Sequence, residues 1–171
     1  LFSLRSCIGY IPQDGYLFSG TVKENIAFAS NIIEDEKIIT VAKKSEILEE
    51  IDSFSNGFET IIGERGVQLS GGQRQRLAIA RTFYKEPNLF IFDDCLSAID
   101  ATKEQKILNN LKEESKGKTS IIISHRIATL KDADHIIVLD AGKIIEEGTH
   151  NELIKNKGFY FEINQSQSNK I

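Results

Sequence analysis

Apolar residues along the chain gather in short runs, separated by stretches in which they recur at helical spacing. The tetrapeptide Leu-Phe-Ile-Phe at residues 89–92 is wholly apolar, which is typical of a strand buried on both faces. Residues 119–123 predict a second buried strand, and residues 7–11 predict a third, which ends at the turn-forming residues 12–15. In residues 74–84 the apolar positions fall on one face of a helix. The pattern therefore predicts buried strands joined by helices.

Two further stretches have helical patterns. Residues 34–54 are rich in Lys and Glu, which form a solvated face, and predict one or two helices. The expected buried stripe of this region is Ile38, Val41, Leu48 and Ile51. Asp100 is a good N-cap for a helix that runs to about Ser115. The expected shared face of that helix is Ala101, Glu104, Leu108 and Leu111.

The C-terminal part of the chain, from residue 135 onward, predicts secondary-structure elements but no functional residues. Residues 135–146 form an expected β-hairpin, and the four residues from Thr149 to Glu152 form a capping box that opens a helix. His135 and His150 are expected to have surface or structural roles. The polar residues 165–171 are expected to fray.

The first candidate for chemistry is the pentapeptide Leu-Ser-Gly-Gly-Gln at residues 69–73, which stands directly before a predicted helix. Free N–H groups and the positive end of the dipole make a helix N-terminus an anion site. The missing Cβ atoms of Gly71 and Gly72 would let a phosphate approach closely. An ordinary cap formed by Ser70 explains the same residues without a ligand.

The second candidate is the acidic pair Asp93 and Asp94, which follows the apolar run. Pro87 ends the preceding helix and separates it from this run. Ligands bind at the carboxyl ends of strands in open parallel sheets, and an acidic pair there suggests Mg²⁺ together with a phosphate that the ion binds. A solvated loop after a core strand is the alternative.

Composition narrows the class of protein. A chain of 171 residues fits one domain, and a net charge of -4 gives no basic footprint for a nucleic-acid partner. The longest apolar runs are far shorter than the roughly 20 residues of a spanning helix. Cys7 and Cys95 are far apart and predict neither a disulfide framework nor a metal set, so a reducing, cytosolic setting is expected.

The two candidate stretches and their spacing resemble the ATP-binding cassette (ABC) ATPases. Residues 69–73 resemble the signature motif, residues 89–94 resemble Walker B, and the sequence Ser-Ala-Ile-Asp at residues 97–100 resembles the D-loop. The likeness runs from Leu4 to about Phe161 and is greatest to the nucleotide-binding domains of exporters.

The resemblance implies an α/β, P-loop NTPase-like cassette, here partial, with mainly parallel buried strands and a helical subdomain that carries the signature motif. The helical subdomain is expected at about residues 27–86, and the α/β core at residues 1–26 and 87–164.

The resemblance also implies ATP and Mg²⁺ as cofactors. Asp93 would hold Mg²⁺ through its water shell, and Gln13, as the Q-loop glutamine, would reach Mg²⁺ and the attacking water. Asp94 occupies the general-base position, and His125 matches the H-loop histidine that steadies the γ-phosphate.

The implied partners are a second nucleotide-binding domain and a transmembrane domain, which would place the chain at the cytoplasmic face of the membrane. The two nucleotide-binding domains pair head to tail, with each signature motif serving the ATP of the other. The residues expected to serve the partner's ATP are Leu69, Ser70, Gly71, Gly72, Gln73 and Asp100. Residues 63–66 resemble the exporter X-loop, which touches the membrane domain.

Two departures from the family pattern stand out. The phosphate-binding loop G-x-x-x-x-G-K-[ST] is missing, and Gly117 is better interpreted as a helix C-cap, so we expect a fragment of a longer protein that is inactive alone. Asp94 stands where competent cassettes usually have Glu, which resembles the degenerate half of a heterodimeric exporter. A homodimer that uses Asp94 as base is the alternative. A soluble ABC ATPase of DNA maintenance and a non-hydrolysing, nucleotide-gated dimerisation module are the rival functions.

Overall fold

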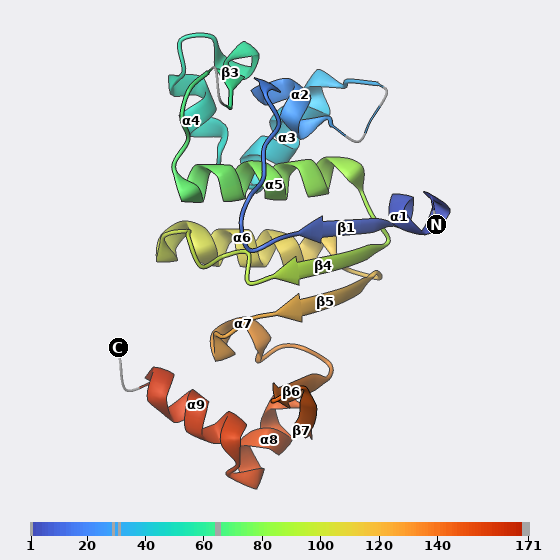
Figure 1. The fold of residues 1–171 in the computed structure, drawn as a ribbon, viewed down its shortest axis with the longest axis vertical. Helices are drawn as coiled ribbons and strands as arrows, with labels where there is room; N and C mark the ends of the chain where they lie inside the picture. The colour runs from blue at the N-terminus through green and yellow to red at the C-terminus, as the bar shows by residue number, and fades with distance from the viewer. Residues whose placement is uncertain (1, 29, 31, 64–65, 169–171) are drawn as a thin grey trace. The chain divides into compact units, whose positions relative to one another are not determined.

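Helix α5 (Gly71–Lys85) is central to the N-terminal part of the computed structural model, which describes residues 2–28, 30, 32–63 and 66–168. Six consecutive residues, Gln75 to Ala80, are buried, as in a helix that is covered on all sides. In Figure 1, α5 lies between the sheet and helices α2 (Val22–Ile26) and α3 (Asp35–Lys44). The predicted apolar face is buried, but Gln75 and Arg76 are buried as well.

The chain divides into two compact units, Leu1–Ile123 and Ser124–Ile171. The helical subdomain expected at about residues 27–86 lies within the first unit. No helix among the described residues is long and apolar enough to cross a bilayer.

The three-stranded sheet of the first unit is parallel, as expected, with the order β1 (Ile8–Ile11), β4 (Leu89–Asp93), β5 (Thr119–Ile123). In its register Ile8 lies beside Leu89, which lies beside Thr119. The central strand β4 therefore carries Asp93 to the carboxyl edge of the sheet.

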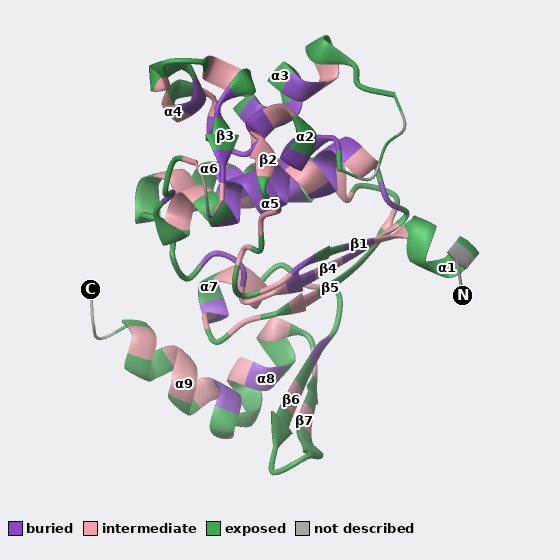
Figure 2. Ribbon diagram, turned by 45° about the horizontal axis from the view of Figure 1, so that its top comes forward, coloured by how far each residue is buried: buried purple, intermediate pink, exposed green. Residues whose placement is uncertain are grey.

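Burial of the strands differs from the prediction. On β4, Phe90 and Phe92 are buried while the alternate residues are half-buried, so only one face of this strand lies fully in the core. Strand β5 is mostly exposed, with Ile121 at 49% and Ile123 at 51%, so the prediction of a buried strand is wrong here. The reason is position, because β5 is an edge strand that pairs with β4 alone among the described strands (Figure 2).

The first strand is one residue shorter than expected, because Cys7 belongs to helix α1 (Phe2–Cys7). The Lys85 ammonium donates to the carbonyl oxygens of Arg5 and Ile8, at 2.8 and 2.7 Å. These bonds join the C-terminus of α5 to the junction between α1 and β1.

Helices make up most of the regular secondary structure of the segment between β1 and α5. Its remaining elements are β2 (Gly20–Thr21), α4 (Leu48–Ser53), the 3₁₀ helix η1 (Gly57–Glu59) and β3 (Ile61–Ile62). Helices α3 and α4 confirm two helices within residues 34–54, with Ile38, Val41 and Ile51 buried. Leu48 is only partly buried, and the neighbouring Ile47 is buried instead.

Helix α6 (Ala101–Glu114) begins after its N-cap Asp100, as predicted. Its buried residues are Ile107 and Leu111, whereas Ala101 is exposed. The inner face is thus set by the pair of apolar residues four apart. Of the face predicted from the sequence, Leu111 is buried and Ala101 is exposed.

The second unit contains α7 (Ile127–Leu130), β6 (Ile136–Asp140), β7 (Lys143–Gly148), α8 (His150–Asn156) and α9 (Phe159–Ser168). Strands β6 and β7 form the predicted hairpin, and Ala141 and Gly142 both have positive φ, as a type I′ turn requires. The capping box at Thr149 is also present. This unit has its own core of Ile127, Ile136, Leu153 and Tyr160.

The expected fraying is wrong for residues 165–168, which continue α9. The Gln167 side chain explains this order, because its Oε1 accepts from the Ile127 N–H and its Nε2 donates to the His125 carbonyl oxygen. His150 shares a 2.9 Å hydrogen bond with the Tyr160 hydroxyl, and His135 lies 3.7 Å from a Glu147 oxygen.

Candidate nucleotide site

The signature segment, residues 69–73, forms the N-terminus of α5. The Ser70 hydroxyl oxygen accepts from the Gln73 N–H at 3.2 Å, and the Gln73 Oε1 accepts from the Ser70 N–H at 2.9 Å. This reciprocal pair is a capping box, so the cap interpretation of Ser70 is correct as local structure. Ser70 and Gly71 are exposed, and the N–H groups of Gly71 and Gly72 have no partner among the described residues. A cap and an open anion site therefore coexist here.

The two glycines of the signature segment differ in their surroundings. A Cβ placed on Gly72 would lie 2.9 Å from the Ala98 carbonyl oxygen, whereas one on Gly71 would meet nothing closer than 3.8 Å. Gly72 is therefore required by contact with the D-loop segment, residues 97–100. This reason is additional to the phosphate approach inferred from the sequence.

Leu69 and Gln73, the flanking residues of the signature segment, have structural contacts. The Leu69 side chain is buried in the core, and its carbonyl oxygen accepts from Arg74 Nη1 at 2.6 Å. The Gln73 side chain is engaged in the capping box. In this chain, the exposed part of the segment is consequently Ser70 and Gly71.

The acidic pair lies at the carboxyl edge of the sheet. The Tyr10 hydroxyl donates to Asp93 Oδ2 at 2.9 Å. Their contact follows from the register, because Tyr10 lies beside Ile91 and Asp93 is the next residue on the same face of β4. The hydrogen bond to the carboxylate raises the pKa of Tyr10. Sequence reasoning missed Tyr10, which only the pairing of β1 with β4 could have identified.

Asp94 leaves the strand in a left-handed backbone conformation, with φ 42°. Its N–H donates to the Ile123 carbonyl oxygen at 2.8 Å, and its carbonyl oxygen accepts from the Ser97 hydroxyl at 3.1 Å. Such a conformation costs roughly 1–3 kcal/mol for most residues other than Gly, although Asp tolerates it better than most. The backbone of Asp94 is therefore fixed from two sides.

Gln13 is exposed in the turn after β1. Since Ile11 pairs with Phe92, Gln13 and Asp94 each lie two residues beyond the last paired position and leave the same edge of the sheet. The structure thus brings Gln13, the expected Q-loop glutamine, and the acidic pair to one edge.

The turn that carries Gln13 is held against α5. Gln75 Nε2 donates to the Pro12 carbonyl oxygen at 2.8 Å, and Gln75 is 1% exposed. A Cβ on Gly15 would lie 2.7 Å from the Arg74 carbonyl oxygen, so the two backbones touch. The burial of Gln75 could not be predicted from the sequence, because the apolar residues around it are the ones that define the buried face of the helix.

The other two predicted site residues are placed separately. Asp100 is exposed and is engaged as the N-cap of α6, where Oδ1 accepts from the Lys103 N–H at 3.0 Å. That backbone hydrogen bond is the main cause that lowers the pKa of Asp100. His125 is exposed and belongs to the second unit. Of the X-loop segment, Glu64 and Arg65 lie outside the described residues.

The acidic pair fits the magnesium ion that the family implies. Mg²⁺ is usually bound by one or two carboxylates together with phosphate oxygens and water, rather than by a full cage of side chains. Asp93 and Asp94, half-buried and adjacent at a strand end, supply that donor set. Asp93 has one oxygen bonded to Tyr10 and a second oxygen that can accept from metal-bound water.

Comparison with known proteins gives the class. A parallel sheet with an acidic pair at its carboxyl edge, in a chain that also carries a capped glycine-rich helix start, is the arrangement of an ABC nucleotide-binding domain. The family model described as ABC transporter matches residues 2–97, more than half of the chain. The chain therefore belongs to the ABC transporter family, and the resemblance found in the sequence is confirmed.

Individual relatives are exporters by their names. The chain is 45% identical over 159 residues to a probable multidrug resistance ABC transporter ATP-binding/permease protein of Bacillus subtilis, covering 93% of this chain and 27% of that protein. It is 41% identical over 169 residues to the mitochondrial iron-sulfur clusters transporter ATM1 of Chaetomium globosum, covering 98% of this chain and 28% of that protein. The chain thus spans less than a third of these relatives.

A solved structure supports the fold. A bacterial Atm1-family ABC exporter with ATP bound has a TM-score of 0.92 and 40% identity to this chain, covering 98% of this chain and 30% of its own. The predicted cassette fold is therefore confirmed.

Proposed function

We propose that the chain is the greater part of the nucleotide-binding domain of an ABC exporter, which binds and hydrolyses ATP to drive export across a membrane. The observation that carries the proposal is the combination of an open anion site at Ser70 and Gly71 with the acidic pair at the end of β4. The exporter names of its relatives support it. The working site lies at the cytoplasmic face of the membrane, where the transmembrane domain is the partner.

Within this proposal the residues of the chain have distinct roles. Asp93 holds the water shell of Mg²⁺, and Gln13 orients water at the same edge of the sheet. Asp94 stands in the position of the general base, and His125 donates to the γ-phosphate. Bound Mg²⁺ would neutralise the charge that develops on the phosphates.

The signature segment serves a second nucleotide-binding domain. Ser70 accepts the Gln73 N–H with its oxygen and still has an O–H to donate, while Gly71 offers an unobstructed N–H. Together with the dipole of the 15-residue α5 these groups favour a γ-phosphate held by the partner. Asp100 supports this surface as the cap of α6.

The phosphate-binding loop is proposed to come from a longer protein. The exposed β5, with an edge that faces no other described strand, can accept a further parallel strand. The chain spans less than a third of its relatives, which agrees with such an arrangement. The chain alone should bind Mg-ATP poorly, and isothermal titration with micromolar affinity would contradict this.

We further propose that this chain is the degenerate-site half of a heterodimer. Asp94 is one methylene shorter than Glu, and a displacement of about 1 Å at a catalytic group can cost on the order of 100-fold in rate. Its backbone is bonded to Ile123 and Ser97, so it cannot easily advance to compensate. ATP binding should survive while turnover by this site is slow.

The test is an ATPase assay of the full-length protein that contains this chain. The wild type and Asp94→Glu are assayed alone and together with the transporter half encoded next to it. We expect that the wild type alone hydrolyses ATP slowly and that the ATPase rate rises when the partner is added. Asp94→Glu should raise the rate further. Brisk hydrolysis by the wild type alone, unchanged by Asp94→Glu, would overturn the degenerate-site proposal. In that case the homodimer with Asp94 as base is correct.

A further inference from the structure

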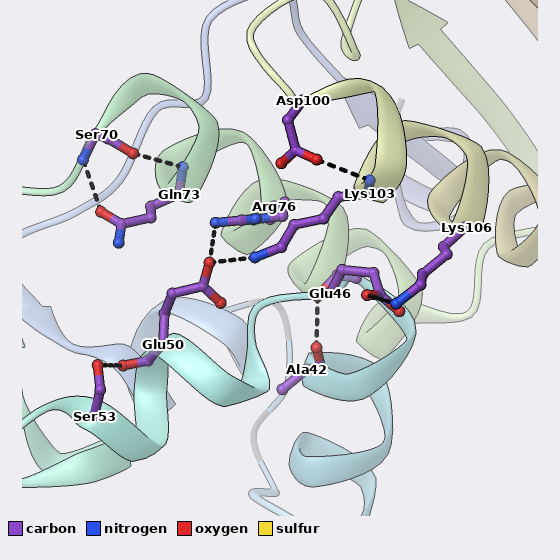
Figure 3. A network of polar contacts seen from close by, with 11 residues as sticks. Ala42, Glu46, Glu50, Ser53, Ser70, Gln73, Arg76, Asp100, Lys103 and Lys106 are labelled. Atoms are coloured by element: carbon purple, nitrogen blue, oxygen red, sulfur yellow. Dashed lines mark hydrogen bonds and ion pairs between the residues drawn. The ribbon is translucent and has the colours of Figure 1, made fainter.

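A single largely buried carboxylate joins three helices of the first unit (Figure 3). Glu50 on α4 accepts with Oε1 from Arg76 Nη2 of α5 at 2.6 Å and from Lys103 Nζ of α6 at 2.5 Å. The side chains of Glu50, Arg76 and Lys103 are 22%, 6% and 25% exposed. Because these groups are shielded from water, the two ion pairs are stronger than surface pairs.

Both cations are attached to the elements that carry the proposed partner-facing residues. Arg76 lies on α5, six residues after the cap Ser70. Lys103 lies in the first turn of α6, and its N–H donates to the D-loop residue Asp100. The D-loop also touches the signature segment directly, where the Ala98 carbonyl oxygen lies against Gly72. Glu50 therefore connects α5 and α6, the helices that follow the signature segment and the D-loop segment, and these two segments also contact each other directly.

The network is incompletely satisfied. Glu50 Oε2 and Arg76 Nε are buried and have no hydrogen-bond partner among the described residues. These are the two atoms that a bidentate pair between a guanidinium and a carboxylate would use. The observed arrangement instead places both cations on Oε1. A turn of the carboxylate toward Arg76 would satisfy both atoms but would weaken the bond to Lys103. This second arrangement would hold α6 less tightly than the observed one.

Glu50 is charged in the folded chain. Burial is the largest influence and opposes ionisation, but the hydrogen bond from Lys103 and the charge of Arg76 outweigh it and lower the pKa of Glu50. Both ion pairs are therefore present at neutral pH.

We propose that Glu50 is a positioning residue that couples the signature segment to the D-loop through Arg76 and Lys103. The inference rests on the proposed function, since it concerns how the partner-facing surface is kept in one geometry. When Lys103 holds Glu50, the first turns of α5 and α6 are fixed together. A shift of the D-loop on pairing with a second domain releases Lys103 and allows the bidentate pair with Arg76 to form.

The test is a double-mutant cycle in the full-length protein together with its proposed partner half, with hydrolysis disabled in every variant by Asp94→Asn and by the corresponding change of the partner's general base. ATP-driven pairing of the nucleotide-binding domains is measured by light scattering for Glu50→Gln, Lys103→Met and the double variant. Urea unfolding is measured on the same proteins. Each single variant should raise the ATP concentration for half-maximal pairing about threefold to tenfold, and the double variant should be no worse than the worse single one.

A matched control lies one turn further along α6. Lys106 Nζ bonds to Glu46 Oε2 at 3.1 Å, which joins the same helix to the residues just before α4 without reaching the D-loop. Lys106→Met should leave ATP-driven pairing unchanged. Equal effects of Lys103→Met and Lys106→Met would overturn the proposal.

The outcomes separate this inference from the proposed function. Absence of ATP-driven pairing between the Asp94→Asn parent and the partner half contradicts the proposed function itself. If the parent pairs but the effects of Glu50→Gln and Lys103→Met on pairing are additive, only the positioning role is contradicted. The same holds if the two substitutions are non-additive in urea unfolding but not in ATP-driven pairing. If Glu50→Gln does not fold, Lys103→Met and Lys106→Met decide the question, because Lys103→Met leaves the ion pair between Glu50 and Arg76 in place.

Discussion

The Tyr10 hydroxyl and the Asp93 carboxylate are joined by a 2.9 Å hydrogen bond between neighbouring strands. The bond occupies Oδ2 and orients the carboxylate at the edge of the sheet where we propose that Mg²⁺ binds. Tyr10 is 52% exposed, so the bond is partly solvated and its contribution is modest.

Tyr10→Phe removes only the hydroxyl. In the full-length protein it should raise the Mg²⁺ concentration for half-maximal ATP hydrolysis a fewfold, since one such bond contributes about 0.5–1.5 kcal/mol. ATP binding without Mg²⁺, followed by fluorescence, should not change.

The control for this variant is Tyr84→Phe. The Tyr84 hydroxyl bonds to the backbone at Ile32 and Glu34, away from the acidic pair, so its loss should lower stability without altering the Mg²⁺ dependence. A Mg²⁺ dependence that is the same in both variants and in the wild type would contradict a role for Tyr10.

The signature glycines should respond differently to alanine. Gly72→Ala places a methyl group 2.9 Å from the Ala98 carbonyl oxygen and should destabilise the protein by about 1–3 kcal/mol in urea unfolding. Gly71→Ala meets no close atom and should be neutral or slightly stabilising, because alanine is the better helix former. If a phosphate binds against Gly71, Gly71→Ala should still weaken ATP-driven pairing of the domains, although it does not lower stability. Equal stability of the two variants would show that the D-loop contact is unimportant.

Gln75 fixes the turn that carries Gln13. Gln75→Leu has similar size but leaves the Pro12 carbonyl oxygen without its donor, which should cost about 1–3 kcal/mol. Hydrogen exchange of residues 13–15 should become faster, while that of β5 should not. Gln105→Leu, on the exposed side of α6, is the matched control and should stay within about 0.5 kcal/mol of the wild type.

Glu50 predicts a pH dependence of stability. Its pKa is lower in the folded chain than the ordinary 4.5, so the stabilisation is complete above 4.5 and is lost as the pH falls through the lower, folded value. The stability difference between the wild type and Glu50→Gln should therefore be largest near neutral pH and shrink on acidification. A difference that grows below pH 4.5 would contradict the ion-pair network.

Local patterns in the sequence predicted most of the elements. The cap at Asp100, the capping box at Thr149 and the strand that ends at Asp93 each depend on residues close in sequence, and each is present. The cassette fold was predicted by resemblance, because the signature and Walker B segments are specific in their order and spacing.

Contacts between distant segments were not predictable in the same way. Tyr10 reaches Asp93 only because β1 pairs with β4, and Gln75 is buried only because the turn after β1 lies on α5. In the sequence, Glu50 is one of many charges on a face expected to be solvated, and only the fold places Arg76 of α5 and Lys103 of α6 against it. The predicted burial of β5 was wrong for a related reason, since an apolar run in the sequence does not reveal which strand lies at the edge of a sheet.

The pairing of β1 with β4 also determines when the sheet can form during synthesis. Ile8 pairs with Leu89, and Leu89 pairs with Thr119, so each pair joins residues that are far apart in the sequence. The backbone hydrogen bonds within a helix instead join residues four apart. Closing so long a loop costs entropy before any strand bond is made, so non-local parallel pairing is slow. A nascent chain emerging from the ribosome should therefore form helical turns first, and β1 cannot pair with β4 until the residues of β4 have left the exit tunnel.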